Sequence, residues 1–94
     1  MNTLGARLKK LRESNNLMQR EVGAVINVDG AFISKIENNE KTVSRNHLKT
    51  LSDFFNVKED ELQTLWLADK IRILIKDEAF GKNALTTVLK DFER

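Results

Sequence analysis

The chain has 94 residues, of which 40% are hydrophobic and 32% are charged, and its net charge is +2. This length predicts one domain with one modest core. The chain has no cysteine and a single histidine, His47, which excludes disulfides and thiolate metal sites and argues against a histidine-rich metal site. No apolar run reaches the ~18 residues of a membrane span, and no apolar stretch of a secretory signal follows the first residues. We therefore expect a cytoplasmic protein with no metal and no cofactor.

Positive charge is concentrated in the N-terminal half. Residues 1–49 hold nine Lys and Arg against five Asp and Glu, a balance of +4, whereas residues 50–94 hold seven against nine, a balance of −2. The basic half is where a polyanion would dock. Ordinary surface charge is the alternative explanation, because the excess is small.

The first part of the chain is typical of three short amphipathic helices. The first begins at Leu4, after a cap at position 2 or 3, and the second covers about residues 19–26. Asn27 tolerates a left-handed backbone and can turn the chain. Asp29 can then cap a third helix, which reaches about Glu37, and Asn39 is a further left-handed candidate that can end it.

Three more helices are expected beyond this point, and no strand. The fourth is capped by Ser44 and has apolar residues at helical spacing: Leu48, Leu51, Phe54 and Phe55. The fifth follows Glu59, and Gly81 marks a break before a last amphipathic helix.

The second and third helices have the lengths and the short connection of a helix-turn-helix. Gly23 has no side chain, so the third helix can approach closely, and Val28 can fill the corner between the two helices. The apolar residues expected to pack across the corner are Val22, Ile26, Ile33 and Ile36. The outer face of the third helix is then free to enter a major groove.

The residues at these positions resemble the Xre/Cro family of phage-repressor-like helix-turn-helix regulators. The resemblance lies in Gln19-Arg20-Glu21-Val22-Gly23, Ile26-Asn27-Val28-Asp29 and Ile33-Ser34-Lys35-Ile36-Glu37-Asn38-Asn39, and it extends over about residues 4–62. It implies an all-α fold with a five-helix lambda-repressor-like DNA-binding core at residues 1–62, whose helix-turn-helix covers about residues 19–37. Residues 63–94 would form a C-terminal helical extension on the same domain.

The resemblance also implies a role for individual residues on double-stranded DNA. Base edges would face Gly30, Ala31, Phe32, Ser34 and Lys35. Phosphates would be contacted by Gln19, Asn38, Asn39, Lys41, Thr42 and Arg45. Arg12 and Glu37 would form a buried ion pair that joins the first helix to the third.

Several positions depart from the family pattern. Gly23 replaces the usual alanine, Asn27 and Asn39 replace usual glycines, and Val43 replaces a frequent proline. Gly30 and Ala31 are also too short for a bidentate contact to a base, which predicts a modest direct code supported by phosphate contacts and DNA shape. For Phe32, partial burial is an equally good interpretation.

The C-terminal extension has more apolar side chains than one helix usually hides against a small core. These helices could complete the core of the monomer, or they could pair with a second copy, which two-fold operators favour. We favour a homodimer, with candidate interface residues Leu65, Trp66, Ile73, Leu85, Val88, Leu89 and Phe92. For Trp66, packing in the core is the alternative.

These observations favour a sequence-specific transcriptional regulator that binds operator DNA as a homodimer, and the resemblance inclines us to a restriction-modification controller. The alternative is a protein-interaction module, or an antitoxin, that keeps the fold and neutralises a partner protein. An enzyme is not expected, because no nucleophile–base pair or metal set is visible, and no small-molecule ligand is evident.

Overall fold

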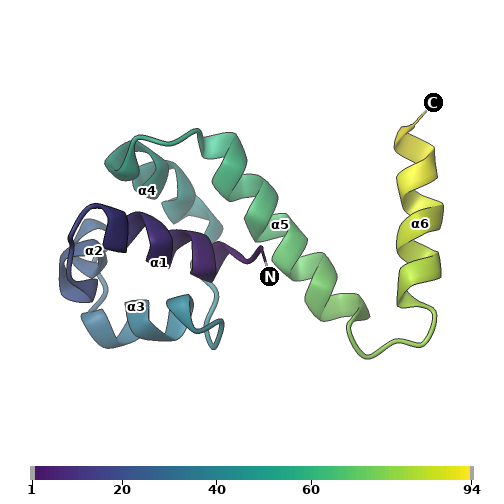
Figure 1. The fold of residues 1–94 in the computed structure, drawn as a ribbon, viewed down its shortest axis with the longest axis horizontal. Helices are drawn as coiled ribbons and strands as arrows, with labels where there is room; N and C mark the ends of the chain where they lie inside the picture. Colours follow the sequence, from purple (N-terminus) through teal and green to yellow (C-terminus); the bar gives the residue numbers. More distant parts are fainter. Residues whose placement is uncertain (1, 94) are drawn as a thin grey trace.

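The computed structural model describes residues 2–93, and every regular element in this range is helical. Figure 1 shows the chain path, with α1 to α5 gathered together and α6 standing apart. The elements are α1 (Leu4–Ser14), α2 (Gln19–Val25), α3 (Gly30–Glu37), a short 3-10 helix (Arg45–His47), α4 (Leu48–Phe55), α5 (Glu59–Ile75) and α6 (Gly81–Phe92). None of the helices described is both long enough and apolar enough to cross a membrane.

Asparagine ends four of the helices by adopting a left-handed backbone. Asn27 and Asn39, where we expected it, have φ of 59° and 63°, and Asn16 and Asn56 have φ of 56° and 55°. Asparagine reaches this region more readily than most residues because its short polar side chain can bond to the local backbone. These positions allow the chain to reverse without a glycine.

The helix starts are held by side-chain caps at two of the predicted positions. The Thr3 hydroxyl accepts from the backbone N–H of Ala6 at 3.0 Å, and the Asp29 carboxylate accepts from that of Phe32 at 2.8 Å. Ser44 does not cap α4, which corrects our prediction. Its hydroxyl donates to the Asn46 side chain at 2.6 Å, and the 3-10 turn separates it from the start of α4 at Leu48.

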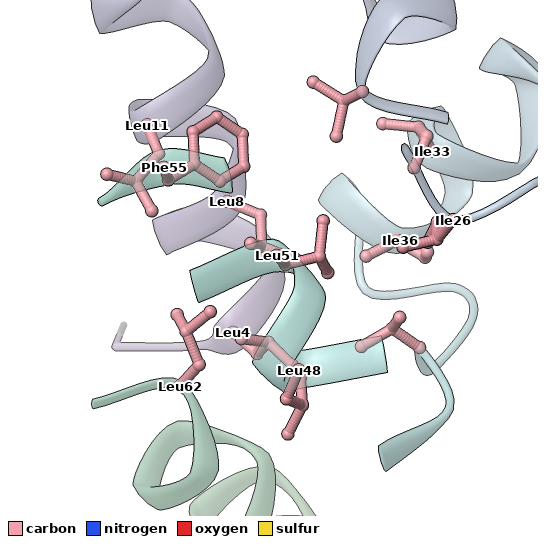
Figure 2. Close-up of a cluster of buried hydrophobic side chains, with 12 residues drawn as sticks. Leu4, Leu8, Leu11, Ile26, Ile33, Ile36, Leu48, Leu51, Phe55 and Leu62 are labelled. Carbon is pink, nitrogen blue, oxygen red and sulfur yellow. The ribbon is translucent and has the colours of Figure 1, made fainter. Parts of the chain in front are cut away.

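One core joins the five helices from α1 to α5 (Figure 2). Its buried side chains are Leu4, Leu8, Leu11, Val22, Ile26, Ile33, Ile36, Val43, Leu48, Leu51, Phe55 and Leu62. Phe54, which we grouped with the inner residues of α4, is 44% exposed. At about 100° per residue it lies well away from the face that carries Leu51 and Phe55.

Polar contacts hold α5 against the start of α1. The Asp69 carboxylate accepts from the backbone N–H of Leu4 at 3.2 Å, and Arg72 donates to Asp69 at 2.8 Å. Arg72 also donates to the carbonyl of Asn2 at 3.3 Å. Because α5 continues without a break to Ile75, the end of the DNA-binding core that we placed at residue 62 lies inside this helix.

Candidate nucleic-acid interface

The corner between α2 and α3 is closed by a glycine. A Cβ atom at Gly23 would lie 2.4 Å from the carbonyl oxygen of Val28, so the turn sits directly on the backbone of α2. Val28 is half-buried and packs against the core beneath the corner. The absence of a side chain at position 23 thus sets the separation of the two helices.

The outward face of α3 carries Ala31, Lys35 and Asn38, which follow one another at intervals of four and three residues and are all exposed. Ile33, Ile36 and Glu37 lie on the opposite face and are buried. The other three residues that we expected to face bases are half-buried at the flanks: Gly30, Phe32 and Ser34. Phe32 packs against the core, so the structure favours the second of its two interpretations.

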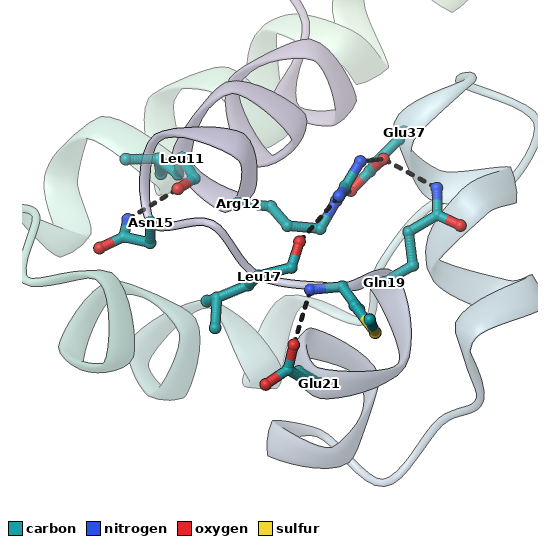
Figure 3. Close-up of polar contacts among 8 residues, drawn as sticks. Leu11, Arg12, Asn15, Leu17, Gln19, Glu21 and Glu37 are labelled. Atoms are coloured by element: carbon teal, nitrogen blue, oxygen red, sulfur yellow. Dashed lines mark hydrogen bonds and ion pairs between the residues drawn. The ribbon is translucent and has the colours of Figure 1, made fainter.

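A buried ion pair fixes the end of α3 (Figure 3). Arg12 donates to the two carboxylate oxygens of Glu37 through Nε at 2.7 Å and Nη2 at 3.0 Å. Its remaining Nη1 donates to the carbonyl of Leu17 at 2.9 Å. The hydrogen bond to Glu37 raises the pKa of Arg12 above its ordinary value. The pair that the resemblance implies therefore also reaches the loop before α2.

Gln19 belongs to the same network. Its side-chain Nε2 donates to Glu37 at 3.1 Å, so the buried carboxylate orients the amide at the start of α2. One N–H of that amide is engaged in this contact, and the amide has a second one that can donate elsewhere. The orientation of a side chain expected to meet phosphate thus depends on the ion pair behind it.

The segment after α3 folds back on the end of that helix. The backbone N–H groups of Glu40 and Lys41 donate to the carbonyl of Lys35 at 2.8 Å and 3.3 Å. Four of the residues expected to contact phosphates lie in this segment and are exposed: Asn38, Asn39, Lys41 and Thr42. Asn39, Lys41 and Thr42 line a hollow beside the start of α1 and the second half of α5.

Arg45, the last expected phosphate contact, is held in place by α5. Its guanidinium lies 4.8 Å from the ring centroid of Trp66, and its Nε donates to Gln63 at 2.8 Å. Gln63 in turn donates to Glu59 at 3.0 Å. We did not predict these contacts, because their only sequence signal is the pairing of a cation with an aromatic residue 21 positions away.

Trp66 is partly buried and makes contacts within the single chain, as in the core-packing alternative that we gave for it. Its indole N–H donates to the carbonyl of Val43 at 3.0 Å, and Lys70 lies 4.9 Å from its ring centroid. Leu65 also packs against the core. The other five residues expected at an interface are all exposed: Ile73 in α5, and Leu85, Val88, Leu89 and Phe92 in α6.

A comparison with known protein families shows which family has the pair of helices α2 and α3. The model of the helix-turn-helix family matches residues 8–62, which is more than half of the chain and includes α2, the turn and α3. No curated protein and no solved structure matches the chain. The chain therefore belongs to the helix-turn-helix family of DNA-binding regulators, of the Xre and lambda-repressor type.

Proposed function

We propose that the protein is a sequence-specific transcriptional regulator that binds operator DNA as a homodimer, with the segment 29–37 in the major groove. The observation that supports this most directly is the outward face of α3. Its residues Ala31, Lys35 and Asn38 are exposed, and α6 lies away from α3 (Figure 1). A helix presented in this way can reach base edges while its inner face stays in the core.

The side chains on this face can make only a few direct contacts to base edges. Lys35 can donate to O6 or N7 of guanine, and Ala31 can contact the methyl group of thymine. Ser34 can bond either a base or a phosphate. Because the remaining positions carry glycine and a packed aromatic residue, we attribute a large share of the specificity to DNA shape.

Phosphate contacts would fix the orientation of the protein on the duplex. Gln19 would donate from the start of α2, and the residues of the segment 38–42 would donate from the end of α3. Arg45 would contribute a charge whose position is preset by Trp66 and Gln63. A side chain that is ordered before binding loses less entropy on binding.

Operator occupancy by a dimer would block or recruit RNA polymerase, in the cytoplasm, at a level set by dimer concentration. Two copies related by a two-fold axis would place two α3 helices on the two halves of a palindromic site. Within this class we favour a controller of a restriction-modification system. A neighbouring methyltransferase reading frame would support that assignment, and a neighbouring toxin or phage gene would contradict it.

The test is fluorescence anisotropy of the full chain on the DNA upstream of its own coding sequence and on a scrambled duplex, at several salt concentrations. We expect tighter binding to the upstream DNA and a change of base preference in Lys35→Ala. Lys90→Ala, on the polar side of α6, removes the same charge and is the matched control. Steep salt dependence with no preference for the upstream DNA would instead indicate a protein-interaction module or an antitoxin.

A further inference from the structure

Helix α5 has apolar side chains on two opposite faces. One face packs into the core through Leu62 and its neighbours. On the other side Leu67, Ile71 and Leu74 follow one another at intervals of four and three residues and are 44%, 43% and 75% exposed. We call these three residues the α5 stripe. Within residues 2–93, no element covers the α5 stripe enough to bury any of its three side chains.

Helix α6 carries a second stripe of the same kind. Leu85, Val88, Leu89 and Phe92 have the spacing of one helix face and remain 44–80% exposed. We call these four residues the α6 stripe. The opposite side of the helix carries polar side chains, among them Thr87. α6 is therefore an amphipathic helix whose apolar face is uncovered.

The turn between the helices holds the two stripes apart. The backbone N–H of Glu78 donates to the carbonyl of Ile75 at 3.0 Å, and that of Gly81 donates to the carbonyl of Glu78 at 3.1 Å. Gly81 is buried against the end of α5, where a Cβ atom would lie 2.7 Å from the Ile75 carbonyl oxygen. α6 leaves this contact in a direction that diverges from α5 (Figure 1), so it does not fold back over its own α5 stripe.

The exposed apolar area matches a dimer interface. Phe80, in the turn, is 75% exposed and adds to the seven stripe residues. With about 150 Å² for each side chain, the lower end of the range for aromatic residues, these eight residues expose on the order of 700 Å². A standard interface takes ~800 Å² from each partner, so the two stripes and Phe80 together supply an area of that order.

We propose that two copies exchange their α6 helices, so that the α6 stripe of each copy covers the α5 stripe of the other. A two-fold arrangement of this kind covers all four stripes at once, because each copy supplies one stripe of each type. The exchange specifies how the proposed homodimer is built, and it rests on the proposed function for the two-fold arrangement. The occupant of the exposed surface is thus a second copy of this chain.

The chain has no cysteine, so introduced thiols report contacts cleanly. One preparation carries Ile71→Cys and a second carries Leu89→Cys, both in the full chain. After mixing and treatment with a short bis-maleimide, we expect a cross-linked dimer that contains one chain of each kind. Thr87→Cys, on the polar side of α6, replaces Leu89→Cys in the control and should give several-fold less product.

Sedimentation supplies an independent measurement. We expect the unmodified chain to sediment at twice the 10.8 kDa of one chain, and Leu89→Glu to reduce this to a single chain. Thr87→Glu introduces the same charge on the opposite side of α6 and should remain dimeric. Circular dichroism should show the same helix content for both variants. If Leu89→Glu fails to fold, the cross-linking result decides.

Three outcomes would overturn the exchange. They are a monomer at tens of micromolar protein, equal cross-linking of the Thr87→Cys control, and a chain carrying both Ile71→Cys and Leu89→Cys that cross-links only within itself. Equal cross-linking of the control would mean that the two stripes have no defined partner. Cross-linking only within one chain would mean that the two stripes pack against each other in the same chain. A dimer that prefers operator DNA, but in which Ile71→Cys cross-links no better to Leu89→Cys than to Thr87→Cys, would contradict the exchange alone. A cross-linked dimer with no DNA preference would contradict the proposed function alone.

Discussion

The contact between Arg12 and Glu37 permits a sharp prediction about stability. Only 2% of the Glu37 side chain and 14% of the Arg12 side chain are exposed, and Arg12 bonds both carboxylate oxygens. Glu37→Gln keeps the size of the side chain and removes its charge. The substitution leaves the guanidinium without a countercharge in a mostly buried site.

The expected loss is large because a buried charge is left uncompensated. Breaking one partner of a buried pair costs about 3–5 kcal/mol. We take the lower end, about 3 kcal/mol, because the guanidinium keeps its bond to the Leu17 carbonyl and has some access to water. For a domain of this size, 1 kcal/mol corresponds to roughly 4–8 °C, so the melting temperature should fall by about 12–24 °C.

The assay is thermal and urea unfolding followed by circular dichroism, at one protein concentration. Asp53→Asn is the matched control, since it removes a carboxylate from the Lys49–Asp53 pair, whose side chains are 71% and 69% exposed. Its effect should stay within about 1 kcal/mol. Replacing both partners, as Arg12→Met with Glu37→Leu, should recover much of the loss. A Glu37→Gln loss no larger than that of Asp53→Asn would refute the reasoning.

Three further variants test other parts of the structure. Gly5→Ala should lower the free energy of unfolding by about 1–3 kcal/mol, because its Cβ would lie 2.2 Å from the Ile36 carbonyl oxygen, and urea denaturation measures this change. Gln19→Ala together with Arg45→Ala should weaken binding to all DNA and lower the salt slope by about one, the share of the lost arginine, and an unchanged slope would remove both from the phosphate interface. Trp66→Phe should cost about 1 kcal/mol through the lost hydrogen bond to Val43, and a stability equal to that of the unmodified chain would contradict that role.

The local features of the fold could be predicted from the sequence because they depend on neighbouring residues. Helical spacing indicated the helices, and side-chain chemistry indicated the cap at Asp29 and the left-handed turns at Asn27 and Asn39. Ser44 was misplaced because its hydroxyl has a competing partner two residues away, in Asn46. Phe54 was misassigned because helical spacing alone does not show which side of α4 faces the core.

The contacts that join distant segments could not be predicted from local patterns. Asp69 bonds the backbone of Leu4 across 65 residues, and Trp66 bonds that of Val43 across 23. Such contacts depend on how helices cross, and spacing along one helix carries no information on this. For the same reason, the sequence did not indicate which apolar residues of the extension pack against the core. Trp66 packs against it, whereas Phe92 is exposed.

The unbroken course of α5 has a consequence for the length of the DNA site. Arg45 rests on the first half of this helix, while Leu74 lies near its end. Each residue inserted within α5 before Leu74 would rotate the end of the helix by about 100° and advance it by about 1.5 Å. In the exchanged dimer, the number of residues in α5 would therefore fix the distance between the α3 helices of the two copies. Family members with a longer or shorter α5 should recognise half-sites at another separation.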